Sequence, residues 1–281
     1  MNRQNTTPHP FSWSAQIELG YQWVNNRTVP TLRRHQGPLR VQRHLYPEGP
    51  EVCQHILLHP PGGIAGGDTL SIYVSAGKNT SVQITNPGAT RWYRSYYPSY
   101  QNTKLYIDDN AILEWLPQES IFFSGCRAYL DTVIKLGVDS RLITWDIFAL
   151  GRPGSNELFT HGEVHQRFQI RSHLNNQLLW SERMKFLGGN ILLHSPVGLS
   201  GYPIAGTLLA NGAVSAKLLE ACRNLPIEGY GGITQFPTGF IVARFLGQES
   251  EAARNWFIAL WEILRPVLIG RSVCFPRIWN T

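Results

Sequence analysis

Residues 59–85 have the sequence HPPGGIAGGDTLSIYVSAGKNTSVQIT, in which a loop rich in glycine and proline leads into alternating polar and apolar residues. The first ten residues contain four glycines and two prolines. Glycine adopts positive φ and proline lacks an N–H group, so this composition predicts a loop. The two runs that follow, at 71–74 and 81–85, alternate with the period of two that is typical of half-buried β-strands. The stretch therefore predicts strands joined by sharp loops.

The glycine loop, residues 59–68, also has the spacing of a phosphate-binding loop, from Gly62 to Gly67. Asp68 follows where such a loop needs a lysine, and its carboxylate would repel a phosphate. A nucleotide site is therefore excluded. Asp68 itself has two interpretations, which the sequence leaves open. It is either a turn residue that accepts hydrogen bonds from nearby amides, or a carboxylate that faces a partner or guides an ion.

Strand-like segments recur through most of residues 11–200. Residues 103–107 and 164–170 alternate with period two, and the aromatic run at 92–97 also favours a strand. Turn signals that contain proline and glycine separate these runs. The chain is therefore predicted to be mainly β.

Two late segments have helical spacing of their apolar residues, 208–222 and 250–264. Ser250 is the predicted N-cap of the second helix and Pro266 its predicted stop. No Gly/Ser-rich linker or block of charge divides the chain. Residues 1–281 are therefore predicted to form a single domain.

The charge composition of the 281 residues limits the functional classes. Only 16% of the residues are charged, against roughly a quarter in an average domain. Such a chain buries much of itself or exposes apolar surface to a partner. The net charge of +6 comes without a recognisable nucleic-acid-binding module. The sequence lacks a membrane-spanning run and an apolar signal peptide, and its four cysteines form no C-x-x-C pair. These features predict a cytoplasmic location, with neither nucleic acid nor membrane as a partner.

Cys53, His55 and His59 share one parity, so in an extended strand they point to the same face. Thiolate and imidazole both suit nickel or zinc. With Asp68, these residues support one hypothesis, a β-rich metal-dependent hydrolase. The alternative is a half-buried strand that leads into the glycine loop. No nucleophile-elbow or protease-type cysteine signature is present, which favours a protein without catalytic activity.

Glu114 and Glu119 flank Trp115, and both carboxylates have two possible roles: structural acceptors, or a relay for a cation. The 9 Trp and 11 Tyr residues suit a wide core as well as an interface. Residues 271–281 are unusually apolar for a chain end, so we expect them to dock on the body or on a partner.

A set of motifs along nearly the whole chain resembles the UreD (UreH) family of urease accessory proteins. The most specific are the glycine loop and the Pro-Gly-Ala-Thr segment. In order, the matching segments are residues 37–43, 46–49, 58–68, 87–95, 113–119, 150–153, 265–266, 270–271 and 276–281.

The resemblance implies a β-helix-like body of stacked sheets with two α-helices in the C-terminal third. It also implies a non-enzymatic scaffold, or chaperone, for metallocentre assembly. Such a scaffold would bind UreF, which recruits the GTPase UreG, and would dock on urease apoprotein to aid nickel insertion. It would hold no permanent cofactor, and nickel would pass transiently along an internal path. Asp68 is the candidate nickel contact on that path.

Overall fold

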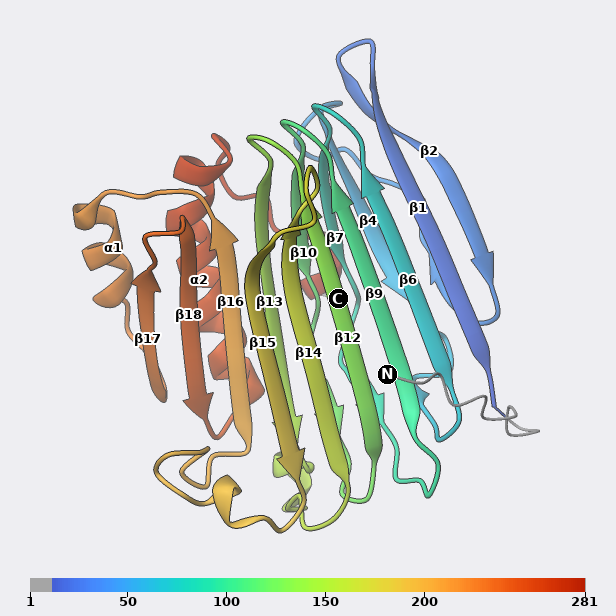
Figure 1. The fold of residues 1–281 in the computed structure, drawn as a ribbon, viewed down its shortest axis with the longest axis vertical. Coiled ribbons are helices and arrows are strands. Elements are labelled where there is room, and N and C mark those ends of the chain that lie inside the picture. The colour runs from blue at the N-terminus through green and yellow to red at the C-terminus, as the bar shows by residue number, and fades with distance from the viewer. Residues whose placement is uncertain (1–11, 281) are drawn as a thin grey trace.

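The computed structural model describes residues 12–280, and within them most strands belong to two large stacked sheets (Figure 1). The seven-stranded sheet faces the viewer in Figure 1. Its strands, in spatial order, are β15 (Leu178–Leu187), β14 (Glu163–Ser172), β12 (Arg127–Leu136), β9 (Ser99–Ile107), β6 (Thr69–Ala76), β1 (Ser14–Val24) and β2 (Arg27–Gln36).

The eleven-stranded sheet lies behind the first and extends past its β15 edge (Figure 1). Its main path is β17 (Tyr230–Gln235), β18 (Phe240–Gly247), β16 (Ile204–Asn211), β13 (Arg141–Leu150), β10 (Ile112–Leu116), β7 (Ser81–Thr85), β4 (Val52–Leu58) and β3 (Arg40–Val41). Three short strands continue it beside the glycine loop: β5 (Gly63–Ile64), β8 (Thr90–Trp92) and β11 (Ser120–Phe122).

The central strands wind as a β-helix. The chain passes from β6 to β7, from β9 to β10 and from β12 to β13, so each coil gives one strand to each sheet. Neighbouring coils pair in parallel and without register shifts, as in β6–β9 and β9–β12. Antiparallel strands cover the edges, with β2 on β1 and β15 on β14. The predicted β-helix-like body of stacked sheets is confirmed.

The hydrophobic core has two parts because β13 is buried on both faces. Leu142 and Phe148 point between the sheets, and Trp145 points to the opposite side. That opposite side is covered by α2 (Ser250–Leu268), whose Phe257 and Trp261 pack against Trp145. The molecule therefore has three layers, two of sheet and one of helix. The tryptophans Trp92, Trp145 and Trp261 are fully buried, so they serve the core.

The predicted helix at 208–222 is only partly correct. Its first residues belong to β16, and the helix, α1 (Ala216–Arg223), begins after Ser215, whose side chain accepts the amide of Leu218. Leu208 and Leu209 are both buried, one on each face of β16. A continuous apolar run of this kind suits a strand buried on both faces as well as a helix, and pairing with β13 and β18 determines the outcome.

Three further predictions need correction. Helix α2 continues through Pro266 to Leu268, and Glu249 rather than Ser250 is its N-cap. Pro266 lacks an N–H group, but the helical hydrogen bonds continue after it. The amide of Ile269 donates to the carbonyl of Arg265, and the amide of Gly270 donates to the carbonyl of Pro266. In the aromatic run, β8 ends at Trp92, and residues 93–97 form a loop against the glycine loop.

The chain end docks on the body, as expected from its apolar residues. The short helix η3 (Arg277–Asn280) carries Trp279, whose Nε1 donates to Thr85 Oγ1 at 2.8 Å. Its ring packs against Trp145 and Trp261. None of the helices within residues 12–280 has the length and apolar character needed to cross a bilayer.

Candidate functional site

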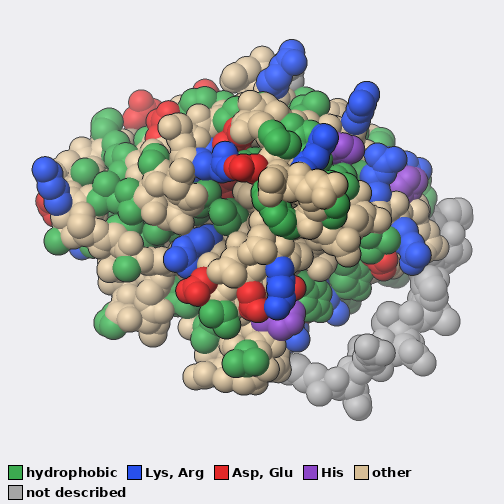
Figure 2. All heavy atoms as spheres, turned by 90° about the horizontal axis from the view of Figure 1, so that it is seen from above, with side chains coloured by type: hydrophobic (Ala, Val, Ile, Leu, Met, Phe, Trp, Pro, Cys, Tyr) green, Lys and Arg blue, Asp and Glu red, His purple; other side chains and the backbone are tan. Residues whose placement is uncertain are grey.

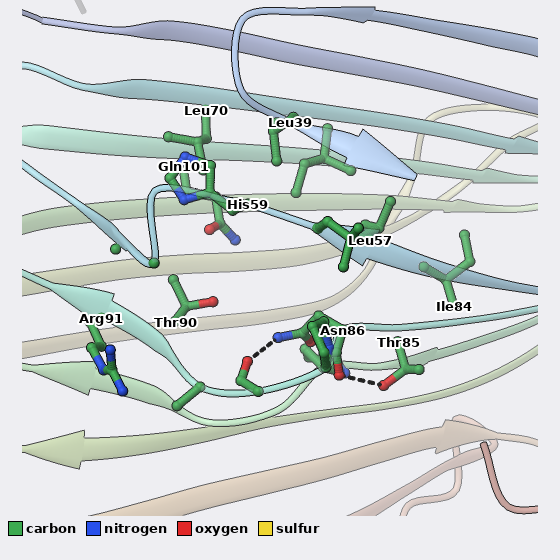
Figure 3. Close-up of a pocket in the computed structure, with 18 of the residues that line it drawn as sticks. Leu39, Leu57, His59, Leu70, Ile84, Thr85, Asn86, Thr90, Arg91 and Gln101 are labelled. Carbon is green, nitrogen blue, oxygen red and sulfur yellow. Dashed lines mark hydrogen bonds between the residues drawn. The ribbon is translucent and has the colours of Figure 1, made fainter. Parts of the chain in front are cut away.

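The glycine loop borders a cavity of about 290 Å³ between the two sheets. Leu57 of β4 and His59 line it from the larger sheet, and Leu70 of β6 and Gln101 of β9 line it from the smaller one (Figure 3). Residues 85–91, which connect β7 to β8, complete the wall. The lining is mainly apolar with a few polar groups, which is typical of a binding cavity.

His59 is the titratable side chain of this wall with an unsatisfied atom. Its ring lies beside Gln101 and Leu70 in Figure 3. Its Nε2 is buried and lacks a hydrogen-bond partner among residues 12–280. Burial lowers the pKa of His59, and the nearby Asp68 carboxylate offsets this only in part. The imidazole is therefore neutral near pH 7, the form in which it can bind a metal ion.

Asp68 is only 5% exposed, and both of its carboxylate oxygens accept backbone amides. Oδ1 accepts the amide of Trp13 at 2.8 Å, and Oδ2 accepts the amide of Ala65 at 2.9 Å. Its own amide donates to the carbonyl of Ala65. This is the geometry of the turn residue, and it joins the glycine loop to the start of β1.

Two glycines of the loop are required for different reasons. Gly67 has a φ of +89°, which L-residues rarely adopt. Gly66 lies so close to the 93–97 loop that an added Cβ would be 2.5 Å from Ser95 Cβ and 2.9 Å from the carbonyl oxygen of Tyr97. The glycine loop is therefore held against a second loop by close backbone packing.

Cys53 and His55 lie on β4 and are buried. Burial raises the pKa of Cys53 to about 12 and lowers that of His55 to about 4, so both are neutral. His55 Nδ1 is 2.5 Å from the Tyr21 hydroxyl. In the part of the chain that the structure describes, His, Cys, Asp and Glu side chains nowhere form a group of three or more that could hold a metal. The hydrolase hypothesis therefore gains no support from this geometry.

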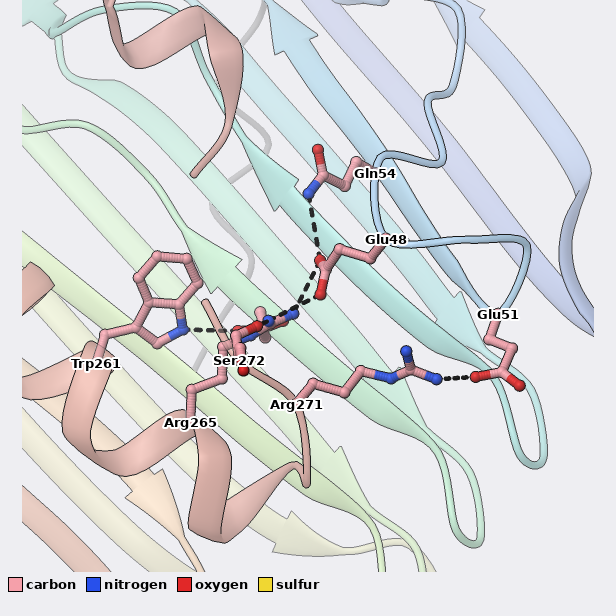
Figure 4. Close-up of polar contacts among 8 residues, drawn as sticks. Glu48, Glu51, Gln54, Trp261, Arg265, Arg271 and Ser272 are labelled. Carbon is pink, nitrogen blue, oxygen red and sulfur yellow. Dashed lines mark hydrogen bonds and ion pairs between the residues drawn. The ribbon is translucent and has the colours of Figure 1, made fainter. Parts of the chain in front are cut away.

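A buried ion network forms a second polar centre, between α2 and the larger sheet (Figure 4). Arg265 of α2 is fully buried and donates to both oxygens of Glu114, at 2.9 and 3.0 Å, and to Glu48. Trp261 also donates to Glu114, at 2.7 Å. Of the two roles open for Glu114, this arrangement matches the structural acceptor. Sequence alone could not reveal the pairing, because the partners are 151 residues apart.

Comparisons with known proteins show the family to which the chain belongs. The family model described as UreD urease accessory protein matches residues 14–280. The chain belongs to the UreD family. It is 63% identical to a urease accessory protein UreD of Nitrosococcus oceani, over 97% of this chain and 92% of that one. It is 52% identical to a urease accessory protein UreD of Pseudomonas paraeruginosa, over 97% of this chain and 96% of the relative. A protein named UreD 2 from Pseudomonas syringae pv. syringae is also 52% identical, over 99% and 98%.

In this UreD-family chain, the motifs that match the family meet in two places in the structure. The Pro-Gly-Ala-Thr segment and the glycine loop line one cavity, although about 20 residues separate them in sequence. Two further matching segments meet in the buried ion network. One contains Glu114, and the other is Arg265 with its neighbour Pro266. The family resemblance found in the sequence is confirmed.

Proposed function

We propose that this UreD-family chain is a non-enzymatic scaffold, or chaperone, in the cytoplasmic assembly of the urease nickel centre. It binds UreF, recruits the GTPase UreG through UreF, and docks on urease apoprotein. The observation that carries this proposal is the family match over residues 14–280. A scaffold role also agrees with the cavity between the sheets and with the large exposed apolar side chains. Residues 12–280 form no metal-binding group of three or more side chains, and the sequence shows no nucleophile motif.

The loop at 188–203, between β15 and β16, is our candidate UreF-binding element. It projects at the lower end of the body in Figure 1 and contains the short helix η2 (Ile191–Leu193). Ile191 and Val197 are 79% and 88% exposed, and Leu192 is also exposed. Apolar side chains gathered on one protruding loop are typical of a protein interface.

Replacing Ile191 and Val197 by Asp together is expected to abolish capture of UreF. The change puts two charges where the proposed interface buries apolar surface, at a cost of several kcal/mol. The measurement is co-purification of UreF with the tagged chain, together with the melting temperature of the chain. A double Asp variant at Val138 and Leu174, which are exposed turn residues at the opposite end of the sheets, is the control. Equal capture by both double variants would remove the loop from the interface.

Nickel is the cargo of the proposed scaffold, and we place its path through the cavity beside the glycine loop. The support is the neutral His59 imidazole, whose Nε2 is unpartnered among the described residues. Nickel favours imidazole ligands. Asp68 stays in the proposal as the adjoining carboxylate, since it interacts electrostatically with His59. A single imidazole, beside a carboxylate whose two oxygens already accept backbone amides, holds an ion weakly, as a transit site requires.

We expect His59→Phe to lower the nickel delivered to urease apoprotein several-fold while UreF capture is unchanged. Phe keeps an aromatic ring at this position and removes both imidazole nitrogens, including Nε2. Thr90→Val is the control, because Thr90 lines the same cavity and Val keeps its volume. Nickel per urease is measured by elemental analysis after activation at limiting nickel. Delivery by His59→Phe equal to that of the parent would refute a role for His59.

Asp68→Asn separates the two roles of Asp68. Asn has one acceptor oxygen, so it can keep only one of the two amide bonds and lowers the melting temperature in either case. If Asp68 guides nickel, delivery per captured complex also falls. Unchanged delivery per complex would assign Asp68 to the turn alone.

A further inference from the structure

The outer face of the seven-stranded sheet carries most of the net positive charge of the chain. Side chains alternate along each strand, and the outward positions follow from the parallel registers and from burial. We call this surface the basic face. Its charged members are Arg34, Lys104, Arg127, Lys135, Arg167, Arg171, Arg183 and Lys185, with the acidic Glu18, Asp131 and Glu163. Eight basic and three acidic groups leave a surplus of five positive charges on one face, against +6 for the whole chain.

Two of the three acidic groups of the basic face form ion pairs within it. Asp131 pairs with Arg167, with Nε to Oδ1 at 2.8 Å. Glu163 accepts from Arg127 at 2.8 Å and from Tyr129 at 2.9 Å. Burial raises the pKa of Glu163, but its hydrogen-bond partners outweigh burial and lower the pKa to about 2. These two carboxylates are therefore neutralised by Arg127 and Arg167, and the surplus charge comes from the other basic side chains.

A stack of aromatic rings lies on the basic face, near the ends at which β9, β12 and β14 begin. Tyr100, Tyr129 and His165 stack across β9, β12 and β14, with ring centroids 5.4 and 4.7 Å apart. Beside this stack lies a shallow recess of about 510 Å³, which Arg183 and Lys185 of β15 border. Both side chains are exposed, and neither forms an ion pair within residues 12–280. Stacked aromatic rings next to unpaired cations are typical of a binding surface.

We propose that the basic face is the docking surface for an acidic patch on a protein, and, resting on the proposed function, that this protein is urease apoprotein. Charge complementarity over a broad sheet raises the rate of encounter and fixes the orientation of the partner. The aromatic stack supplies contact area beside Arg183 and Lys185. The apolar loop proposed for UreF follows β15 at the end of the sheets next to the stack, and the rest of this face stays open to a second partner (Figure 1).

The observations favour a protein over a nucleic acid. The paired carboxylates of Asp131 and Glu163 interrupt the cations, so the basic face lacks the continuous positive stripe that follows a phosphate backbone. The charge also belongs to this face and not to the molecule in general. On the end shown in Figure 2, basic side chains are spread among acidic and hydrophobic ones.

The test measures binding of purified urease apoprotein to the UreF-bound chain at about 50 and 300 mM salt. The variant is Arg183→Glu with Lys185→Glu. Lys217→Glu with Arg277→Glu is the control, since it makes the same charge change on exposed residues of α1 and η3. We expect the variant to bind about tenfold more weakly, chiefly through slower association, with the control close to the parent. We also expect the affinity of the parent to fall as salt rises.

If the parent captured UreF and urease, and the variant and the control bound urease equally well, the docking surface alone would be overturned. A parent that captures neither UreF nor urease apoprotein would overturn the proposed function and the docking surface together. Binding of a short DNA duplex as tightly as urease, lost in the variant, would reassign the basic face to nucleic acid and likewise overturn the proposal. Melting temperatures of both variants equal to the parent show that the fold is intact.

Discussion

Replacing Arg265 by Met is expected to lower the free energy of unfolding by about 3–5 kcal/mol. Arg265 is fully buried and is paired with Glu114 and Glu48. It also donates to the carbonyl of Ser272, at the start of the docked chain end. Its removal leaves the fully buried carboxylate of Glu114 and the largely buried carboxylate of Glu48 without their cation. Urea unfolding followed by tryptophan fluorescence measures the loss.

The destabilisation caused by Arg265→Met depends on pH. Burial raises the pKa of Glu114 even with Arg265 present, and without the guanidinium the pKa rises further. Below that raised pKa the folded variant carries a neutral carboxyl, so the loss of stability should be smaller at about pH 5 than at about pH 8. The control is Arg254→Met on the same helix, where a partly exposed pair is worth about 0–1 kcal/mol. If Arg265→Met lost less free energy of unfolding than Arg254→Met, the buried ion network would not be important for stability.

Gly66→Ala is expected to lower the free energy of unfolding by about 1–3 kcal/mol, the usual cost of overpacking. The added methyl would meet Ser95 Oγ, which can rotate away, but also the carbonyl oxygen of Tyr97, which is part of the backbone. The glycine loop must then move away from the 93–97 loop and reshape the cavity. We therefore expect activation of urease to fall together with the melting temperature.

Gly88→Ala is the matched control for this prediction. Gly88 lines the same cavity, but a Cβ built there meets no atom within 4 Å. Its stability and its activation of urease should match those of the parent. If Gly66→Ala melted and activated like Gly88→Ala, the close packing of the two loops would be irrelevant to function.

The strands of the seven-stranded sheet were largely predictable because one face of each is buried. Period-two runs at 71–74, 103–107 and 164–170 lie in β6, β9 and β14. Prediction failed where that periodicity disappears. Leu208 and Leu209 are buried on opposite faces of β16, so their spacing resembled that of a helix. Alternation reports burial, and a strand covered on both faces has no alternation to report.

The candidate site was predicted in part. The glycine-rich composition predicted the loop and pointed to Asp68, and the structure gives Asp68, Gly66 and Gly67 each a role in the turn or in loop packing. His59 was grouped with Cys53 and His55 as one face of a strand. The ladder ends at Leu58, however, so His59 alone lines the cavity beside the loop.

By itself, the sequence of this chain determined the family, the strand content and the loop that needs glycine, because these depend on local chemistry and on the order of motifs. Only the tertiary structure decided which charges meet. Arg265 and Glu114 are 151 residues apart in the chain but bonded in space. The basic face likewise exists because parallel coils place every second residue of successive strands side by side. Coulomb interactions depend on distances in space, and the winding of the β-helix sets those distances.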